Sequence, residues 1–183
     1  MIGPRPVHDR GILDALEAID PESFAGEVWR VTRKGRDALR GSTANGRWSP
    51  SGAEFEVLYT SLERDGALAE IGYRLSLEPV WPSRMEHEVH LIAVETERTL
   101  RFADLESLSP LGVEITRYHT FDYQATQAIA AAAYFLELDS LIVPSARFPC
   151  GNLVIFTERA TPLVLRNSQA VDWESWRRRH ERR

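Results

Sequence analysis

The sequence predicts a mixed α+β fold, organised as a single domain over residues 1–183. Segments with the alternating pattern of strands occur in both halves of the chain, and segments with helical periodicity are interspersed among them. Their order shows no regular strand–helix–strand alternation, which favours the α+β class. A chain of 183 residues can bury one full hydrophobic core, and neither an internal repeat nor a low-complexity linker divides it.

Most of the predicted strands are short segments rich in β-branched and aromatic side chains. In chain order the expected elements are a short helix within 9–20, strands at 26–33 and 55–61, a helix at 64–75, strands at 86–96 and 99–105, a helix at 121–138, strands at 139–146 and 151–157, an apolar segment at 162–167 and a helix from 172. Between the first two strands a long loop of Gly, Ser, Asn, Pro and Arg residues begins at Gly35. Loops of that length in compact domains often carry function.

The predicted helices are marked by the spacing of their apolar residues and by residues at their ends. In the first helix, four apolar residues share one face, and Pro21 follows the last of them. The segment 64–75 has an apolar face with Glu70 beside it. The Ala-rich interior of the helix at 121–138 allows close packing, and Asp172 offers a carboxylate to cap the last helix.

Composition disfavours several classes of protein. The formal net charge of −5 disfavours broad nucleic-acid binding, and the longest apolar run is too short to span a bilayer. The first twenty residues lack the basic and apolar regions of a secretory signal, and the single Cys150 cannot form an intrachain disulfide. We therefore expect a cytoplasmic protein. The basic segment 176–183 is interpreted as a solvated helix end, with nucleic-acid or partner contact as the alternative.

No metal site or dinucleotide-binding fingerprint is expected. His87 and His90 occur with Glu86 and Glu88 on a predicted strand, a pattern that favours a surface face over a metal site. The segment "GSTANG" lacks the glycine spacing and the strand-to-helix context of a Rossmann fingerprint.

Arg47, Tyr59 and Glu70 are the first candidates for a functional site. An arginine among glycines offers a planar fork of donors to phosphate or carboxylate, a tyrosine offers a flat face to a ring, and a partly buried glutamate can stabilise a cation formed during a reaction. The alternatives are structural. Arg47 would pair with Glu54 or Glu56 in a turn, Tyr59 would be a core or edge aromatic residue, and Glu70 would be a half-exposed surface carboxylate.

The residues of several short segments, and the order of these segments along the chain, resemble those of a known family. The series runs "VWRVT", "GRWSPSG", "VLYTS", "ALAE", "QATQAIAAAA", "LIVPSAR" and "GNLVIF". It spans roughly residues 26–157 and resembles the RES domain family, named for its arginine, glutamate and serine. The resemblance implies an α+β fold similar to the catalytic core of ADP-ribosyltransferases.

The resemblance also implies an activity and a set of site residues. RES proteins are typically toxins of bacterial toxin–antitoxin pairs that cleave the nicotinamide–ribose bond of NAD by hydrolysis or phosphorolysis. By that resemblance, Arg30 and Arg47 would contact phosphate or ribose groups, Tyr59 would stack near the nicotinamide, Glu70 would be the catalytic carboxylate and Ser145 would line the pocket. Asn152 also matches, and its role is open between the site and the start of a strand.

The resemblance further implies NAD as substrate rather than as a bound cofactor, with inorganic phosphate as a candidate co-substrate. The expected partners are an antitoxin with a helix-turn-helix DNA-binding domain and a second copy of the chain in a homodimer. Two alternatives stay open. One is an ADP-ribosyltransferase that modifies a protein, and the other is a RES-like binding module without catalysis.

Overall fold

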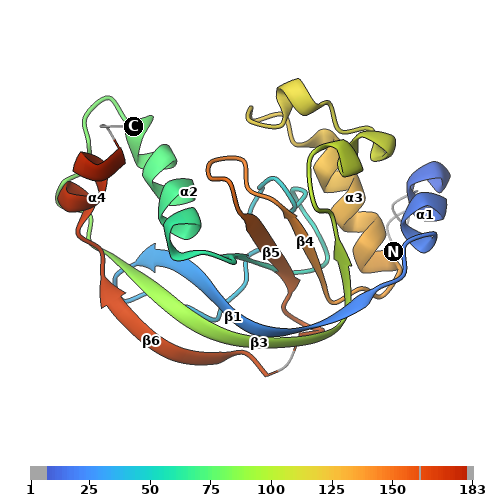
Figure 1. The fold of residues 1–183 in the computed structure, drawn as a ribbon, viewed down its shortest axis with the longest axis horizontal. Helices are drawn as coiled ribbons and strands as arrows, with labels where there is room; N and C mark the ends of the chain where they lie inside the picture. The colour runs from blue at the N-terminus through green and yellow to red at the C-terminus, as the bar shows by residue number, and fades with distance from the viewer. Residues whose placement is uncertain (1–7, 161, 181–183) are drawn as a thin grey trace.

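A six-stranded sheet with mixed pairing forms the centre of the molecule, as seen in a computed structural model that describes residues 8–160 and 162–180. The strands are β1 (Glu22–Arg33), β2 (Val57–Ser61), β3 (His87–Arg101), β4 (Ser140–Pro144), β5 (Gly151–Phe156) and β6 (Val164–Ala170). Their order is β1-β2-β5-β4-β3-β6, and β1 also pairs with β3. This additional pairing closes the first five strands into a barrel-like sheet, with β6 added along β3 (Figure 1).

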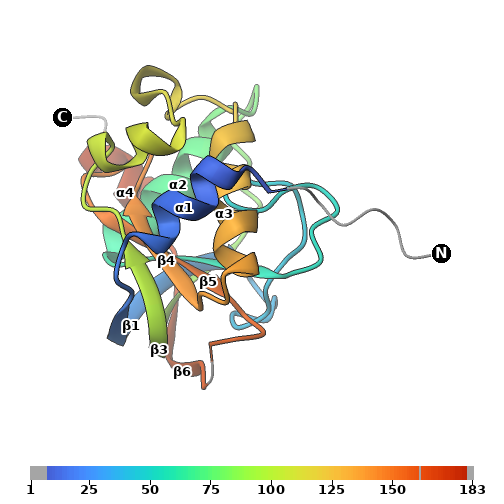
Figure 2. The same cartoon turned by 90° about the vertical axis from the view of Figure 1, so that its right-hand side faces the viewer.

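Helices cover the two ends of this sheet. They are α1 (Arg10–Glu17), α2 (Arg64–Ser76), α3 (Gln124–Phe135) and α4 (Trp173–His180), with short 3-10 helices at Glu106–Leu111 and Ile115–Arg117. In Figure 1, α2 and α4 lie at one end, α1 and α3 lie at the other, and β4 and β5 run between them. Figure 2 shows α1 lying across α3. The mixed α/β class predicted from the sequence is confirmed. None of the helices in the described residues is long and apolar enough to cross a membrane.

β3 is one strand of 15 residues where the sequence predicted two, at 86–96 and 99–105. Glu97 and Arg98 lie between the two predicted segments, and the backbone continues through them because it finds new partners there. The amides of Glu97 and Arg98 donate to the Asp139 carboxylate at 2.8 and 2.9 Å. Beyond them the strand pairs in parallel with β4, from Thr99 opposite Ser140. The strand ends at Arg101, and the Phe102 amide makes one further bond to β4 by donating to the Ile142 carbonyl at 2.8 Å.

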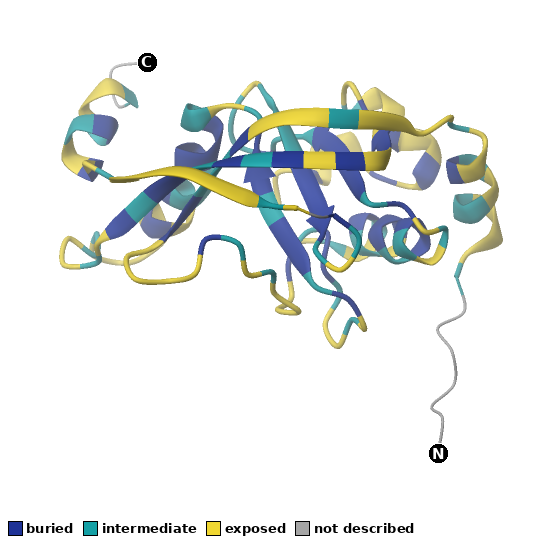
Figure 3. Ribbon diagram, turned by 90° about the horizontal axis from the view of Figure 1, so that it is seen from below, coloured by how far each residue is buried: buried dark blue, intermediate teal, exposed yellow. Residues whose placement is uncertain are grey.

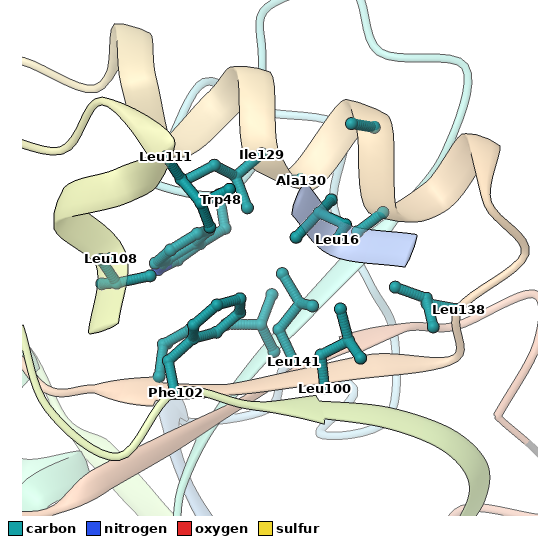
Figure 4. Packing of buried hydrophobic residues seen from close by; sticks show 14 of the residues in the cluster. Leu16, Trp48, Leu100, Phe102, Leu108, Leu111, Ile129, Ala130, Leu138 and Leu141 are labelled. Carbon is teal, nitrogen blue, oxygen red and sulfur yellow. The ribbon is translucent and has the colours of Figure 1, made fainter. Parts of the chain in front are cut away.

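The largest hydrophobic cluster fills the space between α1, α3, the 3-10 helices and the sheet. Leu16 of α1, Ile129 of α3 and Leu141 of β4 meet there with at most 2% of their surface exposed (Figure 4). The Ala-rich face of α3 permits this close approach, since Ala130 and Ala133 are fully buried in the same cluster. The sequence therefore identified the packing helix correctly, although α3 is shorter than the predicted span 121–138.

A second apolar layer fixes α4 against α2. Trp173 and Trp176 of α4 pack against α2, and a Cβ at Gly72 would lie 2.7 Å from the ring of Trp176, so only glycine allows this contact. The Asp172 carboxylate accepts from the Ser175 amide at 2.9 Å and caps α4, as predicted. Two parts of the sequence-based predictions lie outside the described residues. They are the end of the expected basic helix, at 181–183, and residues 1–7 of the N-terminal segment in which no secretory signal was expected.

β6 lies on the outer face of the structure. All seven of its residues are exposed, and Figure 3 shows it as a continuous exposed strand beside β3. On its inner side it is held to β3 by antiparallel pairing from Glu88 opposite Ala170 to Ala93 opposite Val164. Two histidines strengthen this region of the sheet.

His87 and His90 are buried, which corrects the expectation that they lie on a surface face. Their exposed fractions are 5% and 3%. The His90 ring lies 2.8 Å from the Thr32 hydroxyl and 2.7 Å from the Ser168 hydroxyl, so it links β1, β3 and β6. The Trp173 indole N–H donates to His87 Nδ1 at 3.1 Å. Since an indole only donates, Nδ1 must be the acceptor, and its 3.2 Å approach to the Met85 carbonyl is not a donated bond.

We expect the stability of the protein to fall as the pH drops below about 6.5, the ordinary pKa of histidine in an unfolded chain. Burial lowers the pKa of both His87 and His90 in the folded state. The unfolded chain therefore binds protons that the folded chain excludes, and stability is lost as the pH falls toward the folded pKa values. Thermal midpoints between pH 8 and pH 5 measure this effect. The double variant His87→Gln, His90→Gln should have a flatter profile above pH 5, and an unchanged slope would contradict the assignment.

Candidate functional site

A cavity of about 220 Å³ lies where β1, β2 and β5 meet α2 and the loops around residues 47, 121 and 145. We call it the central cavity. Arg30, Arg47, Tyr59, Glu70 and Asn152 all line it, so the fold brings together residues that are up to 122 positions apart in the sequence. Roomier hollows occur elsewhere on the described surface, such as a groove of about 490 Å³ between α2 and α4, but they do not gather this set.

Glu70 is held by two hydrogen bonds on one carboxylate oxygen. Its Oε1 accepts from the Ser145 hydroxyl at 2.7 Å and from the Asn152 side-chain amide at 3.1 Å. Ser145 is itself fixed, because its Oγ accepts from the backbone amides of Arg147 and Phe148 at 3.2 and 3.3 Å. Ser145 is not among the lining residues of the cavity and instead supports Glu70. The carboxylate is thus half-buried and oriented in advance.

Asn152 reaches the site from the second residue of β5, where it pairs with Ser61 of β2 and Val143 of β4. The sequence left its role open between the site and the start of the strand. The structure places it in both, because its backbone is in the sheet and its amide contacts Glu70. Its Oδ1 is buried and has no hydrogen-bond partner within residues 8–160 and 162–180. A polar residue beginning an otherwise apolar strand was the available signal.

Arg47 contacts neither Glu54 nor Glu56 in the turn that the sequence offered as an alternative. Its guanidinium donates to the backbone carbonyls of Tyr118 and Thr120, the latter at 3.3 Å. It also lies over the rings of Tyr118 and Tyr123, at 4.7 and 5.0 Å from their centres. Arg47 therefore ties the long loop before β2 to the segment before α3 and presents a fixed positive charge to the cavity.

Tyr59 combines a structural hydroxyl with a ring on the cavity wall. The Trp48 amide donates to its Oη at 3.0 Å, and a Cβ at Gly46 would lie only 2.7 Å from the same oxygen. The position of the tyrosine hydroxyl thus requires glycine at position 46. Burial raises the pKa of the Tyr59 hydroxyl to about 12, so it stays protonated at neutral pH.

Arg30 holds the other end of the long loop. Its Nη1 donates to the carbonyls of Ala38 and Arg40 at 2.7 and 2.9 Å, and burial lowers the pKa of its guanidinium, with Asp37 opposing that shift. Both predicted ligand-binding arginines, Arg30 and Arg47, therefore also hold the fold of the protein itself. Their charges still line the cavity.

The charge of the cavity is opposite to that of the chain. Its charged lining residues are the arginines 30, 47, 74 and 147 together with Glu70, whereas the whole chain has a formal net charge of −5. Sequence reasoning missed Arg74 and Arg147, although Arg74 lies one helical turn after Glu70, which was a usable signal. Such a cavity can bind an anion and, beside Glu70, stabilise a cation. The described residues contain no cluster of His, Cys, Asp or Glu side chains able to hold a metal ion.

Comparisons with known proteins identify relatives of the whole fold. The family model of the RES domain matches residues 27–177. The NAD(+) phosphorylase MbcT of Mycobacterium tuberculosis H37Rv is 24% identical over 170 residues, covering 90% of this chain and 91% of that protein. The probable NAD(+) phosphorylase Rv3189 of the same organism is 36% identical over 152 residues, covering 79% of this chain and 71% of that protein.

A solved structure has the same fold. It is the crystal structure of the M. tuberculosis MbcT–MbcA toxin–antitoxin complex, in which the matching chain superimposes with a TM-score of 0.81 at 23% sequence identity. The match covers 93% of this chain and 97% of that one. The arrangement of sheet and helices is therefore shared over nearly the whole length of both chains.

We expect Tyr59→Phe to destabilise the protein by about 1–3 kcal/mol, because it leaves the buried amide of Trp48 without a partner. Tyr73→Phe is the matched control, since the Tyr73 hydroxyl makes no hydrogen bond within the described part of the chain and its ring also lines the cavity. Thermal or urea unfolding of both variants measures the difference. Equal stability of Tyr59→Phe and the unsubstituted protein would show that the hydroxyl has no structural role.

Proposed function

The chain belongs to the RES domain family, and we propose that it is an NAD-degrading enzyme that cleaves the nicotinamide–ribose bond with inorganic phosphate as co-substrate. The observation that carries the proposal is the oriented carboxylate of Glu70 in a cavity whose other charged lining residues are arginines. The names of the two relatives, an NAD(+) phosphorylase and a probable NAD(+) phosphorylase, support the choice of phosphate over water.

The charges of NAD match those of the central cavity. NAD carries a cationic nicotinamide ring at one end of a ribose and an anionic diphosphate at the other. Glu70 supplies the negative group for the nicotinamide ribose, and Arg30 and Arg47 supply positive groups for the diphosphate. The Tyr59 ring provides an apolar wall for the nicotinamide, a role that its half-buried position permits.

Glu70 would act on the cation that forms as the bond breaks. The C1–N bond electrons pass to the pyridinium nitrogen, so nicotinamide leaves as a neutral molecule and needs no general acid. The remaining ribose has oxocarbenium character, which a fixed carboxylate stabilises more than a mobile one because its orientation costs nothing during the reaction. A phosphate oxygen then bonds to C1 and gives ADP-ribose 1-phosphate. Ser145 and Asn152 act through Glu70 as positioning residues.

The biological setting follows from the same relationship. We propose a toxin of a toxin–antitoxin pair, acting in the cytoplasm, whose partner is an antitoxin with a helix-turn-helix domain that covers the central cavity. Support for an antitoxin comes from the structural relative, which is a toxin–antitoxin complex. A homodimer and a fold similar to the catalytic core of ADP-ribosyltransferases are further proposals, and they rest on the family resemblance. No bound cofactor is needed, because NAD is consumed.

The direct test is incubation of the purified protein with NAD, with and without inorganic phosphate. We expect free nicotinamide in the proton NMR spectrum and a new phosphate ester in the phosphorus spectrum. Omission of phosphate should slow nicotinamide release several-fold and leave ADP-ribose as the product.

Other products would point to the alternatives. Nicotinamide release that is independent of phosphate would indicate a hydrolase. Transfer of ADP-ribose to an added protein would indicate a transferase. Absence of any NAD loss would leave the chain as a binding module and would contradict the proposal.

A further inference from the structure

Arg74 differs from the other arginines of the central cavity in that its guanidinium has no partner among the described residues. Its guanidinium makes no hydrogen bond or ion pair within residues 8–160 and 162–180, and the residue is exposed on the cavity side of α2. Burial raises the pKa of the neighbouring Tyr59 hydroxyl, and the positive charge of Arg74 partly opposes that shift. A free arginine fork lining a cavity is a donor group available to a ligand.

The other three arginines are already engaged. Arg30 donates to two loop carbonyls, and Arg47 donates to two more while lying over two tyrosine rings. Arg147 donates to the His119 carbonyl at 2.8 Å and lies 3.5 Å over the ring of Tyr73. Their positions are fixed by the protein, so they suit a ligand group that binds in one place.

Arg74 follows Glu70 by one turn of α2, yet the two do not form the ion pair that this spacing usually allows. Glu70 instead receives its hydrogen bonds from Ser145 and Asn152. The positive charge of Arg74 is therefore not neutralised by its neighbour. Four residues of helix rise by about 6 Å, and both side chains line the central cavity, so the positive group of Arg74 and the carboxylate of Glu70 face the same space.

We propose that Arg74 binds the inorganic phosphate that attacks C1 of the nicotinamide ribose. This inference rests on the proposed function. An attacking phosphate dianion must approach the carbon beside the negative carboxylate of Glu70, on a chain whose formal net charge is −5. A nearby cation offsets this repulsion and raises the local phosphate concentration. A guanidinium also orients the phosphate through two parallel hydrogen bonds and leaves a third oxygen free to form the new bond.

Steady-state kinetics with varied phosphate and varied NAD test the assignment. Arg74→Gln should raise the KM for inorganic phosphate by about tenfold or more, the equivalent of one lost charge-assisted hydrogen bond, and change the KM for NAD by less than twofold. The KM of Arg74→Lys for inorganic phosphate should lie between those of Arg74→Gln and the unsubstituted protein, because lysine keeps the positive charge and loses the planar fork of donors. Arg64→Gln is the control on the same helix, since Arg64 does not line the central cavity. It should leave both constants unchanged.

A second measurement needs no turnover. At constant ionic strength, inorganic phosphate should raise the thermal midpoint of the unsubstituted protein and of Arg64→Gln, and the shift should be lost in Arg74→Gln. An Arg74→Gln protein that binds phosphate normally, or that loses NAD affinity instead, would overturn the inference and leave the proposed function intact. A protein that binds phosphate through Arg74 but does not cleave NAD would overturn the function and leave the anion site.

Discussion

The hydrogen bonds from Ser145 and Asn152 to one oxygen of Glu70 are the interaction on which the site depends. They join three parts of the chain: helix α2, the loop after β4 and the start of β5. Glu70 is a half-buried carboxylate, and such a group is costly to bury unless it is hydrogen-bonded. The closed sheet meets this requirement, because the antiparallel pairing of β4 with β5 brings Val143 opposite Asn152 and so carries both donors to the same edge.

A second constraint is the ordering of the long loop before β2. This loop has little regular structure of its own, and arginine side chains hold it by donating to backbone carbonyls. The Thr126 hydroxyl adds a bond from α3 to the Arg47 carbonyl at 2.5 Å, and the Gln127 amide adds one to the Gly46 carbonyl at 2.8 Å. The helix that packs the main hydrophobic cluster therefore also positions the loop that lines the cavity. In this way the stability of the fold and the shape of the site are coupled.

Local patterns in the sequence were sufficient for the class of the fold and for most of its elements. The apolar spacing in α1, the Ala-rich face of α3 and the cap at Asp172 all rest on nearby residues, so they could be predicted. Features that depend on contacts between distant parts of the chain could not be predicted in this way. The continuity of β3 depends on Asp139, some forty residues away, and the burial of His90 depends on Thr32 and on Ser168 of β6. The sequence identified Glu70 but missed Arg74, although their spacing of one helical turn in α2 was a usable local signal.

The central claim is that the negative charge of Glu70, and not only its shape, drives the cleavage of NAD. Glu70→Gln tests it most directly, because a glutamine oxygen can still accept from Ser145 and Asn152 while the charge is lost. Nicotinamide release should fall by about a hundredfold or more, with the thermal midpoint and the KM for NAD nearly unchanged. Glu63→Gln, at an exposed carboxylate just before α2, should behave like the unsubstituted protein. A folded Glu70→Gln protein that released nicotinamide at the full rate would contradict the account.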